Sequence, residues 1–523
     1  MTALLVLSLA ALAVSQTTCQ SVTLNLQQKV PAGASKLIDS SFPSFAIQGS
    51  SFASYTGRPT LDCDEAAQKH EADYATGNAS HPNIFSRNLI RSVEERTGGP
   101  LVVRVGGTNT DYSNFNPDQA LPVTPPQQGA GIGQKFVFGP VFYEGFRNWP
   151  GTRWVYDVPF AKSNKTNSQY EARAAVDNIG LENLEALEIG NEVDLYVKQG
   201  SRPAGYGPAE FSADWRAYAD WLVGALGLPA GPLFQTLTLS SAHAAPFSAQ
   251  SVFDAGITDG NLVKSVSFHH YEYTNTTTGL QSTLMNHTFV KDGLNAYLPD
   301  FEYMQAHYPN VQVVLGESGR YTDKQSSIDQ SEGIFGSALW TADYLLYAAS
   351  LNVTRVNMQL GQVFGYVAWH PIAFDGLQPE VRSPYYGHLL VADFIGKSKA
   401  FRVSEVQTND DLVAAYAGYE QDQLRRVAII NYKVWQKGSG ARPARTFTLP
   451  VPRGVRSVKV QTLTSSGGAS VNGTASWAGR TWTYENNGVG EKVPGLDEFT
   501  TVPVSGGRAN VKIGASEAVI VHI

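Results

Sequence analysis

Short apolar runs alternate with helical stretches over most of the chain. Within residues 208–226, Phe211, Trp215, Tyr218 and Leu222 recur at steps of three and four, the period of a helix with one buried face. The apolar runs are shorter and lie between Gly, Pro, Asn and Asp residues, so each predicts a buried strand. We expect strands at residues 45–47, 101–105, 154–158, 184–189, 234–239, 263–268, 311–315 and 355–360, with helices at 169–179, 208–226, 294–307 and 336–350.

This alternation predicts an α/β fold in which repeated βα units surround a parallel sheet. Eight units close naturally into a (β/α)8 TIM barrel, which we assign to residues 41–395. Beyond residue 396 no helical period remains, and residues 396–523 predict a C-terminal antiparallel β-sandwich. Residues 16–40 carry an N-terminal strand, with Val22, Leu24 and Leu26 alternating, that is expected to join the sandwich. The sandwich strands are expected at 412–416, 426–430, 446–449, 455–460, 482–484, 509–511 and 518–523.

Composition narrows the class of protein. The chain has 523 residues, only 16% of them charged, with 49 Gly and 27 Pro, which is typical of a folded, loop-rich enzyme. Its formal net charge of −7 provides no basic surface for nucleic acid or an anionic bilayer. We therefore expect neither nucleic acid nor a membrane as a partner of the mature chain.

The N-terminus predicts secretion. Residues 1–15 form an apolar run that is too short to span a bilayer and ends in the small residues Ala13-Val14-Ser15, as a secretory signal peptide does. The chain also carries N-x-Ser/Thr sequons, so N-linked glycans are expected on an extracellular protein. Cys19 and Cys63 can form at most one disulfide, and the sequence leaves open whether they pair. The sequons are at Asn78, Asn164, Asn275, Asn286, Asn352 and Asn472.

Two strands end in a glutamate. Leu187 to Glu192 reads Leu-Glu-Ile-Gly-Asn-Glu, and Val313 to Glu317 reads Val-Val-Leu-Gly-Glu. A pair of carboxylates about 5 to 5.5 Å apart at the lip of a barrel performs double displacement in retaining glycosidases. One carboxyl must be protonated while the other is anionic. Asn191 can hold a sugar hydroxyl beside Glu192, so we assign Glu192 as the acid/base and Glu317 as the nucleophile.

Two further clusters lie at strand ends. His269-His270-Tyr271 follows the sixth strand, where an imidazole or a phenol can hydrogen-bond the nucleophile. Gly106-Gly107-Thr108-Asn109 follows the second strand, and Thr108 and Asn109 can donate to sugar hydroxyls. The histidines have no partners at ligand spacing, and the phosphate-loop pattern with its Lys is absent. We expect no metal and no cofactor.

These motifs, in this order, resemble glycoside hydrolase family 79, the family of heparanase and microbial β-glucuronidases. The resemblance spans about residues 22 to 523, since that family also has a C-terminal β-sandwich built partly from the N-terminal strand. It implies a retaining enzyme with Glu192 as acid/base and Glu317 as nucleophile. It further implies that Asn191 and Tyr271 support these residues, and that Thr108 and His269 lie near the sugar.

The sequence departs from this family after the nucleophile. Family members follow it with a Tyr and a Gly-Gly pair that receives the glucuronate carboxylate, whereas this chain continues Ser-Gly-Arg-Tyr. Tyr321 is the candidate match for that Tyr. Arg320 or Lys324 is a candidate cation for the carboxylate, and a solvated loop charge is an equal alternative for Arg320. In residues 365–370, Tyr366 is the candidate carboxylate ligand, and Trp369 is an equally good apolar platform for the sugar.

The expected function is therefore that of a secreted β-glucuronidase acting on a glycoside substrate. Two alternatives stay open at this point. The first is a retaining β-glycosidase for a neutral sugar such as a glucoside, galactoside or xyloside, which the missing Gly-Gly pair favours. The second is a relative that binds carbohydrate without catalysis, against which the presence of both glutamates argues.

Overall fold

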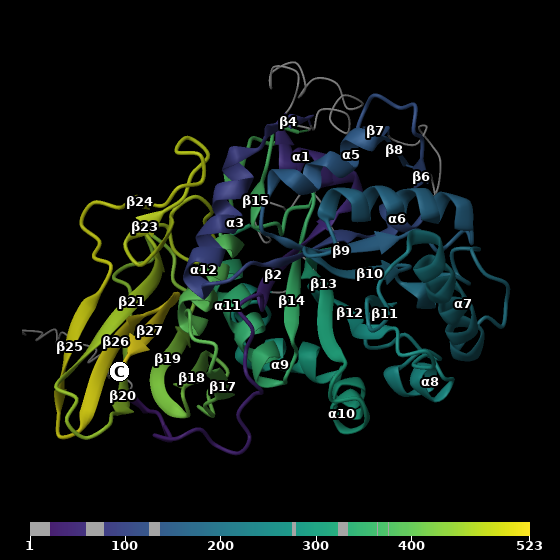
Figure 1. The fold of residues 1–523 in the computed structure, drawn as a ribbon. Coiled ribbons are helices and arrows are strands. Elements are labelled where there is room, and N and C mark those ends of the chain that lie inside the picture. The colour runs from purple at the N-terminus through teal and green to yellow at the C-terminus, as the bar shows by residue number, and fades with distance from the viewer. Residues whose placement is uncertain are drawn as a thin grey trace, which may run out of the picture.

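The expected barrel is confirmed. A computed structural model describes residues 21–58, 78–124, 136–274, 279–322, 333–362, 364–374 and 376–523. Eight parallel strands form a closed barrel within this part of the chain (Figure 1). In ring order they are β2 (Pro43–Gln48), β5 (Val102–Gly106), β9 (Arg153–Val158), β10 (Leu184–Ile189), β11 (Phe234–Leu239), β12 (Val263–Thr274), β13 (Gln312–Thr322) and β14 (Arg355–Leu360).

Two barrel strands are longer than the sequence pattern indicates. β12 and β13 were expected to end at residues 268 and 315, but they stay paired as far as Thr274 and Thr322. Their added segments are polar, and a pattern search for apolar runs stops where they begin. Because side chains of a strand alternate between its two faces, this extension presents one set of residues to the barrel mouth and another set outward.

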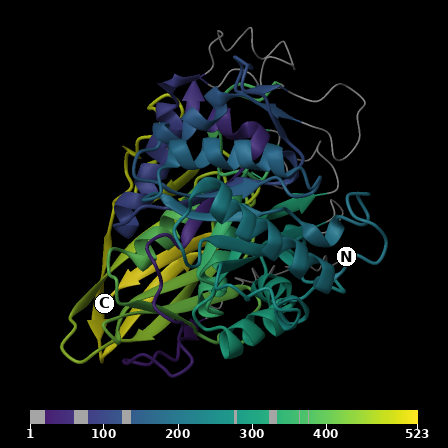
Figure 2. The same cartoon turned by 45° about the vertical axis from the view of Figure 1, so that its right-hand side comes forward.

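Helices surround the barrel, as Figure 2 shows. The region predicted as one helix at 294–307 is instead the end of α9 and the whole of α10, because Pro299, in the first turn of α10, lacks the N–H that a continuous helix needs. The helices are α1 (Phe52–Thr56), α3 (Ile84–Thr97), α4 (Thr108–Asp111), α5 (Pro140–Glu144), α6 (Lys165–Ile179), α7 (Pro208–Leu226), α8 (Ala249–Asp254), α9 (His287–Asn295), α10 (Leu298–His307), α11 (Phe335–Ser350) and α12 (Pro384–Ile395).

Short strands decorate the loops on the barrel. They pair as β3 with β4, β15 with β16, and β8 with both β6 and β7. Their bounds are β3 (Gly57–Arg58), β4 (Asn78–Pro82), β6 (Asn114–Phe115), β7 (Val123–Thr124), β8 (Val137–Phe138), β15 (Trp369–His370) and β16 (Glu380–Val381).

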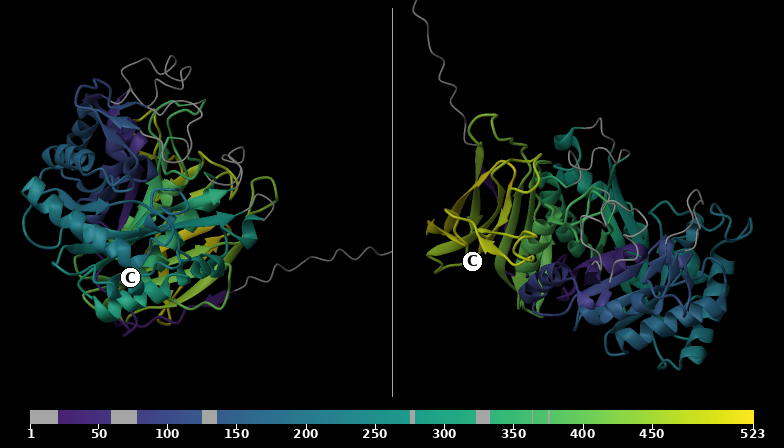
Figure 3. Two further views of the ribbon diagram at one scale, coloured as in Figure 1. Left: turned by 90° about the vertical axis from the view of Figure 1, so that its right-hand side faces the viewer. Right: turned by 90° about the horizontal axis from the view of Figure 1, so that it is seen from above.

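The C-terminal region forms the expected β-sandwich beside the barrel (Figure 3). One layer contains β1, β20, β26 and β25, and β1 pairs in parallel with β20. The other layer contains β17, β18, β19, β27 and β21, with β22 to β24 at its end. The bounds are β1 (Ser21–Thr23), β17 (Phe401–Glu405), β18 (Val413–Glu420), β19 (Gln423–Asn431), β20 (Ala444–Pro450), β21 (Ser457–Ser465), β22 (Ala475–Trp477), β23 (Arg480–Thr481), β24 (Glu491–Lys492), β25 (Thr500–Ser505), β26 (Arg508–Gly514) and β27 (Glu517–His522).

The second layer is buried on both faces. Val413 and Ala415 of β18 face the interior of the sandwich together with Leu24 and Leu26, which follow β1. Ala414 and Tyr416 face the barrel, where α11 and α12 cover the sheet. Burial on both faces explains the continuous apolar runs of these strands.

The strand predicted at 482–484 is wrong. Trp482 lies outside any strand, and its backbone N–H donates to the Tyr386 hydroxyl of α12 at 3.1 Å. The two rings pack edge to face, 5.8 Å apart, so helix packing rather than sheet pairing fixes this segment.

Among the described residues, no helix is both long enough and apolar enough to cross a bilayer. The predicted signal peptide, Cys19, Cys63 and Lys324 lie outside the described residues.

Candidate active site

Glu192 lies just beyond the carboxyl end of β10, held by a sharp turn. Gly190 has a φ of 83°, and a Cβ there would lie 2.5 Å from the Tyr196 hydroxyl, so this position accepts only glycine. Glu192 itself adopts the left-handed conformation, with φ 50° and ψ 54°. This conformation is uncommon for a residue with a side chain, and its occurrence at a candidate catalytic position indicates strain retained for function.

Glu317 lies within the extended part of β13. Its Oε2 accepts a hydrogen bond from Nη1 of Arg104 at 2.7 Å, and its Oε1 accepts one from the Tyr271 hydroxyl. Burial alone would raise the pKa of Glu317, but His269, Arg104 and Tyr271 together hold that pKa below its ordinary value. Glu317 is therefore held as a carboxylate, the form that its predicted role as nucleophile requires.

Arg104 links the two carboxylate-bearing strands across the barrel. Besides Glu317, it donates through Nε to Glu188 Oε1 at 2.8 Å and through Nη2 to Asn191 Oδ1 at 2.7 Å. Only 1% of its side chain is exposed. The sequence analysis did not select Arg104 as a site residue, although an arginine inside the apolar strand Val-Val-Arg-Val is a usable signal, since a buried charge needs partners.

His269 joins the surroundings of the two glutamates. Its Nδ1 lies 3.1 Å from Glu192 Oε1, and on the β12–β13 ladder it pairs directly with Glu317. The Tyr297 hydroxyl donates to its carbonyl oxygen at 2.6 Å and fixes the backbone. Both predicted catalytic glutamates therefore contact or adjoin one buried imidazole at the same end of the barrel.

The predicted sugar ligands on the second and fourth strands also come together. The Nδ2 atom of Asn191 lies 3.5 Å from Thr108 Oγ1, a long contact that leaves this donor available to a hydroxyl group. Thr108 begins α4, and the next residue, Asn109, donates to Ser50 Oγ at 2.8 Å. Thr108 and Asn109 are half-buried at the mouth.

Aromatic rings form one wall beside the nucleophile. The Tyr366 and Tyr271 rings lie 5.8 Å apart, and Tyr366 stacks on Phe364 at 5.2 Å. Gly319 of β13 separates the two tyrosines, because a Cβ there would lie 3.0 Å from Tyr366 and 3.1 Å from Tyr271. Burial and the nearby Glu317 carboxylate raise the pKa of Tyr271, which therefore stays a hydrogen-bond donor.

Trp369 is not available as a sugar platform. It is fully buried, its ring lies 5.1 Å from Phe45, and its Nε1 donates to Ser86 Oγ at 2.9 Å. Of the two alternatives in this segment, the structure places only Tyr366 beside the catalytic pair.

The prediction that Arg320 faces the sugar is corrected by the structure. Arg320 pairs with Glu272 on the β12–β13 ladder, and a Cβ on Gly293 of α9 would lie 2.6 Å from the Glu272 carboxylate, so the two lie on the outer, helix-covered face. Arg320 is also buried, so it is not a solvated loop charge. Burial raises the pKa of Glu272 to about 8, and the positive charge of Arg320 opposes that rise. The next residue, Tyr321, belongs to β13 and pairs through its backbone with Tyr273.

Chemically, the site combines an anionic carboxylate held by two donors with a second carboxylate whose side chain is 20% exposed. That pairing can perform nucleophilic attack and proton transfer on one glycosidic bond. Among the described residues, no group of three or more His, Cys, Asp or Glu side chains is placed to hold a metal ion.

Comparisons with known proteins identify relatives among the glycoside hydrolases. Residues 415–520 match the glycosyl hydrolase family 79 C-terminal beta domain. The chain is 27% identical over 447 residues to a β-glucuronidase of Aspergillus niger, an alignment that covers 79% of this chain and 81% of the relative. It is 25% identical over 540 residues to a β-glucuronidase of Neurospora crassa, covering 92% of this chain and 91% of that relative.

Solved structures share the fold. A 4-O-α-L-rhamnosyl-β-D-glucuronidase of Fusarium oxysporum superposes with a TM-score of 0.77 at 20% identity, covering 96% of this chain and 100% of the other. A family 51 α-L-arabinofuranosidase of Bifidobacterium longum superposes with a TM-score of 0.60 at 14% identity, covering 96% and 98%. The barrel with its sandwich and the matching relatives together show that this chain is a glycoside hydrolase, and its C-terminal region is similar to that of glycoside hydrolase family 79.

Proposed function

We propose that the protein is a secreted, retaining β-glucuronidase. The observation that carries the mechanism is the set of contacts on Glu317, which Arg104 and Tyr271 hold in its anionic form beside His269 and Glu192. The sugar is proposed from the two curated relatives, both of which are β-glucuronidases.

The proposed reaction has two balanced steps. Glu317 attacks the anomeric carbon while Glu192 gives its proton to the leaving oxygen, so the glycosidic bond breaks and a glycosyl ester forms. Glu192, now ionised, takes a proton from water as the water oxygen attacks the anomeric carbon of the glycosyl ester, and the bond from that carbon to Glu317 breaks. Glu317 leaves as a carboxylate, and the sugar departs with its original anomeric configuration.

The residues around Glu317 suggest how the sugar lies. Tyr271 and Tyr366 close one side, and the Asn191 amide faces Thr108 on the other. The Asn191 amide is suited to a hydroxyl at carbon 2, a contact that strengthens in the transition state.

One observation favours a neutral sugar instead. Arg320 lies on the outer face of the ladder with Glu272, and the Gly-Gly pair is absent from the sequence after Glu317. Among the described residues, a uronate carboxylate would then be bound by neutral donors such as the Tyr366 hydroxyl, and the second candidate cation, Lys324, lies outside those residues.

The first experiment compares p-nitrophenyl β-glucuronide with the corresponding glucoside, galactoside and xyloside. We expect the glucuronide to be hydrolysed fastest and Glu317→Gln to lose about 10⁴-fold or more in turnover. Glu272→Gln is the matched control, because it alters a buried carboxyl on the outer face of the same ladder. Faster hydrolysis of a neutral glycoside would refute the uronate, and an active Glu317→Gln variant would refute the nucleophile.

Two further measurements test the remaining parts of the proposal. Proton NMR of the first-formed product should show the β-anomer, whereas an α-anomer would exclude double displacement. Secretion is tested by N-terminal sequencing of protein collected from a eukaryotic host medium, which should begin after Ser15. Retention of residues 1–15 inside the cell would contradict it.

A further inference from the structure

The sequons whose side chains the structure describes fall into two structural types. Asn164 and Asn286 are helix N-caps, and each uses only its Oδ1 atom, which accepts a backbone N–H at 3.2 Å from Asn167 and at 3.1 Å from Phe289, respectively. N-linked glycosylation replaces one hydrogen on Nδ2 and leaves Oδ1 unchanged. These two caps therefore survive attachment of a glycan.

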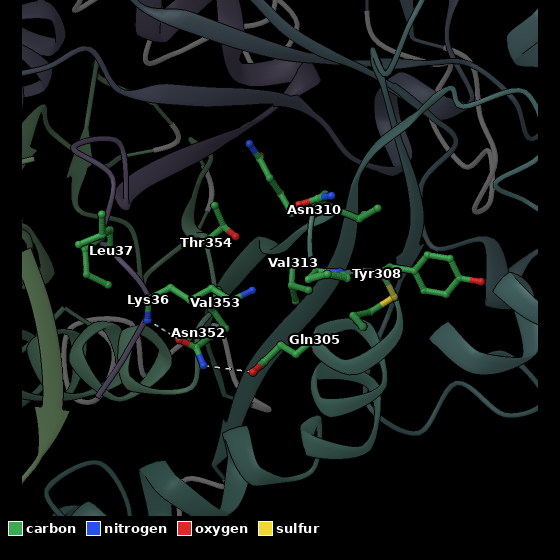
Figure 4. A pocket seen from close by; sticks show the side chains of 14 residues that line it. Lys36, Leu37, Gln305, Tyr308, Asn310, Val313, Asn352, Val353 and Thr354 are labelled. Carbon is green, nitrogen blue, oxygen red and sulfur yellow. Dashed lines mark hydrogen bonds between the residues drawn. The ribbon is translucent and has the colours of Figure 1, made fainter. Parts of the chain in front are cut away.

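Asn352 and Asn472 use both ends of their carboxamides. Asn352 accepts from the Lys36 backbone N–H at 2.6 Å and donates through Nδ2 to Gln305 Oε1 at 3.1 Å. Figure 4 shows these bonds across a cavity of about 190 Å³ at the amino-terminal end of the barrel. A glycan on this Nδ2 would leave one hydrogen for the bond to Gln305 and would have to fit beside that bond, so its attachment is expected to disturb the tie between the N-terminal segment and α10.

Asn472 is constrained in the same way. Its Nδ2 donates to Glu380 Oε2 at 3.2 Å, and its Oδ1 accepts from Ser383 Oγ at 3.2 Å. It thereby joins the sandwich to the segment that precedes α12. A glycan here would disturb contacts between the two parts of the protein.

Asn286 differs from Asn164 because it lines a cavity. An open hollow of about 650 Å³ lies between the barrel residues 279–286 and the sandwich residues 409–412. In Figure 1, α9, which begins just after Asn286, lies beside β17 and β18, the strands that flank residues 409–412. Asn164, in contrast, is exposed at the start of α6.

The lining of this hollow suits an amino sugar. Asp411 is exposed, and its Oδ1 accepts a hydrogen bond at 2.6 Å from Thr288, the threonine of the Asn286 sequon. Asn409, Ser282 and Asp411 together present amide, hydroxyl and carboxylate groups. These groups can bind the hydroxyl and acetamido groups of a sugar. The His287 backbone N–H donates to the Asp411 carbonyl at 2.8 Å and fixes one wall against the other.

We propose that Asn286 carries an N-linked glycan whose innermost N-acetylglucosamine lies in this hollow between barrel and sandwich. Asn164 carries a second glycan that projects into solvent, and Asn352 and Asn472 remain unmodified. In the transfer, Asn286 Nδ2 bonds to the anomeric carbon of a lipid-diphosphate oligosaccharide, the bond from that carbon to the diphosphate oxygen breaks, and Nδ2 loses one proton. The inference rests on the proposed secretory route and is independent of the substrate.

The test is peptide mapping of protein secreted by a eukaryotic host. Enzymatic deglycosylation in heavy-oxygen water converts each glycosylated Asn to labelled Asp, and we expect the label at 164 and 286 but not at 352 or 472. Thr288→Ala should remove the label at 286, whereas Thr288→Ser keeps both the sequon and the hydroxyl and should retain it. Label at 164 without label at 286 would overturn the inference. Loss of label at both positions would overturn it too, together with the secretory route, while hydrolytic activity still reports on the proposed catalysis.

Seating of the sugar in the hollow is tested by deglycosylating the folded protein. We expect the Asn286 glycan to be released at least about tenfold more slowly than the Asn164 glycan, because release requires local opening. After denaturation the two rates should become equal. Asp411→Ala should accelerate release at 286 without changing release at 164. Equal rates in the native protein would show that the Asn286 glycan points into solvent.

Discussion

Two ion clusters, each built on a buried carboxylate, lie at opposite ends of the same barrel. The mouth cluster contains one cation, Arg104, which binds both Glu188 and Glu317. The floor cluster has the reverse ratio, since three cations lie within 4.0 Å of a single carboxylate, Glu185. These cations are Arg153, Lys264 and Arg355.

The difference explains how similar chemistry can serve two purposes. Arg104 binds two carboxylates at the mouth, and together with His269 and Tyr271 it holds Glu317 anionic where the site opens. No hydrogen bond or ion pair of the described residues joins the floor cluster to Glu192 or Glu317. Each of its three cations is one of three that compensate the charge of Glu185. We infer that the mouth cluster determines reactivity and that the floor cluster only stabilises the barrel, consistent with the usual division between the two ends of this fold.

The largest expected effect follows removal of the mouth cation. Arg104→Met leaves Glu188 buried without its counter-ion, so the free energy of unfolding should fall by about 3–5 kcal/mol. Turnover should fall by about 10³-fold, because Glu317 loses the donor that keeps it anionic and oriented. Urea denaturation and steady-state kinetics measure the two effects.

A double variant separates stability from catalysis. Arg104→Met combined with Glu188→Leu removes Arg104 and its fully buried partner, so it should recover part of the lost stability, while Glu317 still lacks its cation and turnover stays low. Recovery of turnover together with stability would show that Arg104 acts only through folding. Arg355→Met at the floor is the matched single variant and should lose less stability, because two cations remain at Glu185.

A further buried carboxyl, Glu171, has no cation beside it in the described part of the chain, and it shows what the cations of the two clusters contribute. Glu171 of α6 accepts hydrogen bonds only from neutral groups, including Ser113, Asn167 and Tyr156, and burial raises its pKa to about 7 from 4.5. The folded state thus holds this proton more tightly than the unfolded state does. The contribution of Glu171 to the free energy of unfolding should therefore be fully present below pH 4.5, and about 3 kcal/mol of it should be lost as the pH rises through about 7.

Glu171→Gln should remove this part of the pH dependence, as measured by urea denaturation at a series of pH values. The stabilities of the wild type and the variant are best compared below about pH 6.5. Above that pH, deprotonation of His287 lowers the stability of both proteins. Burial opposes the charge on His287, but Asp343 and Glu405 raise its pKa to about 9, so its contribution is lost between 6.5 and 9. Parallel profiles for the wild type and Glu171→Gln would show that Glu171 ionises normally.

The barrel strands and the two glutamates could be predicted from local sequence patterns. The direction in which side chains such as Arg320 point depends on the register between strands and could not be predicted in this way. Apolar runs located all eight barrel strands, and the abrupt Gly-Asn-Glu and Gly-Glu ends located Glu192 and Glu317, because each signal lies within a few adjacent residues. The outward direction of Arg320 was not predictable, because the ladder shifts register between Phe268 and His269 and again between Leu315 and Ser318. Such a shift changes which residues face the mouth, and a single strand does not reveal it.

A smaller effect is expected when one donor to the nucleophile is removed. Tyr271→Phe deletes the hydroxyl that donates to Glu317 and leaves the ring against Tyr366. One of the groups that lowers the pKa of Glu317 is lost, so that pKa should rise and the acidic limb of kcat/KM should move to higher pH. Turnover should fall by about 10²-fold with little change in KM. An unshifted acidic limb would contradict this role. Tyr344→Phe, on the outer face, is the control and should leave the limb in place.

The smallest expected effect on stability and turnover follows a substitution in the floor cluster. This variant also gives the most direct test of whether the two clusters act independently. The Nζ atom of Lys264 lies 3.1 Å from Glu185 Oε1 and donates to the Glu185 carbonyl at 2.6 Å, and 23% of its side chain is exposed. Lys264→Met leaves Arg153 and Arg355 to compensate Glu185, so unfolding should become easier by only about 1 kcal/mol. Turnover should stay within about twofold of the wild type, because no reacting group contacts the floor cluster. If Lys264→Met instead lowered turnover as much as Tyr271→Phe does, the two ends of the barrel would be coupled. The excess of cations at the floor would then have to be counted among the determinants of reactivity at the mouth.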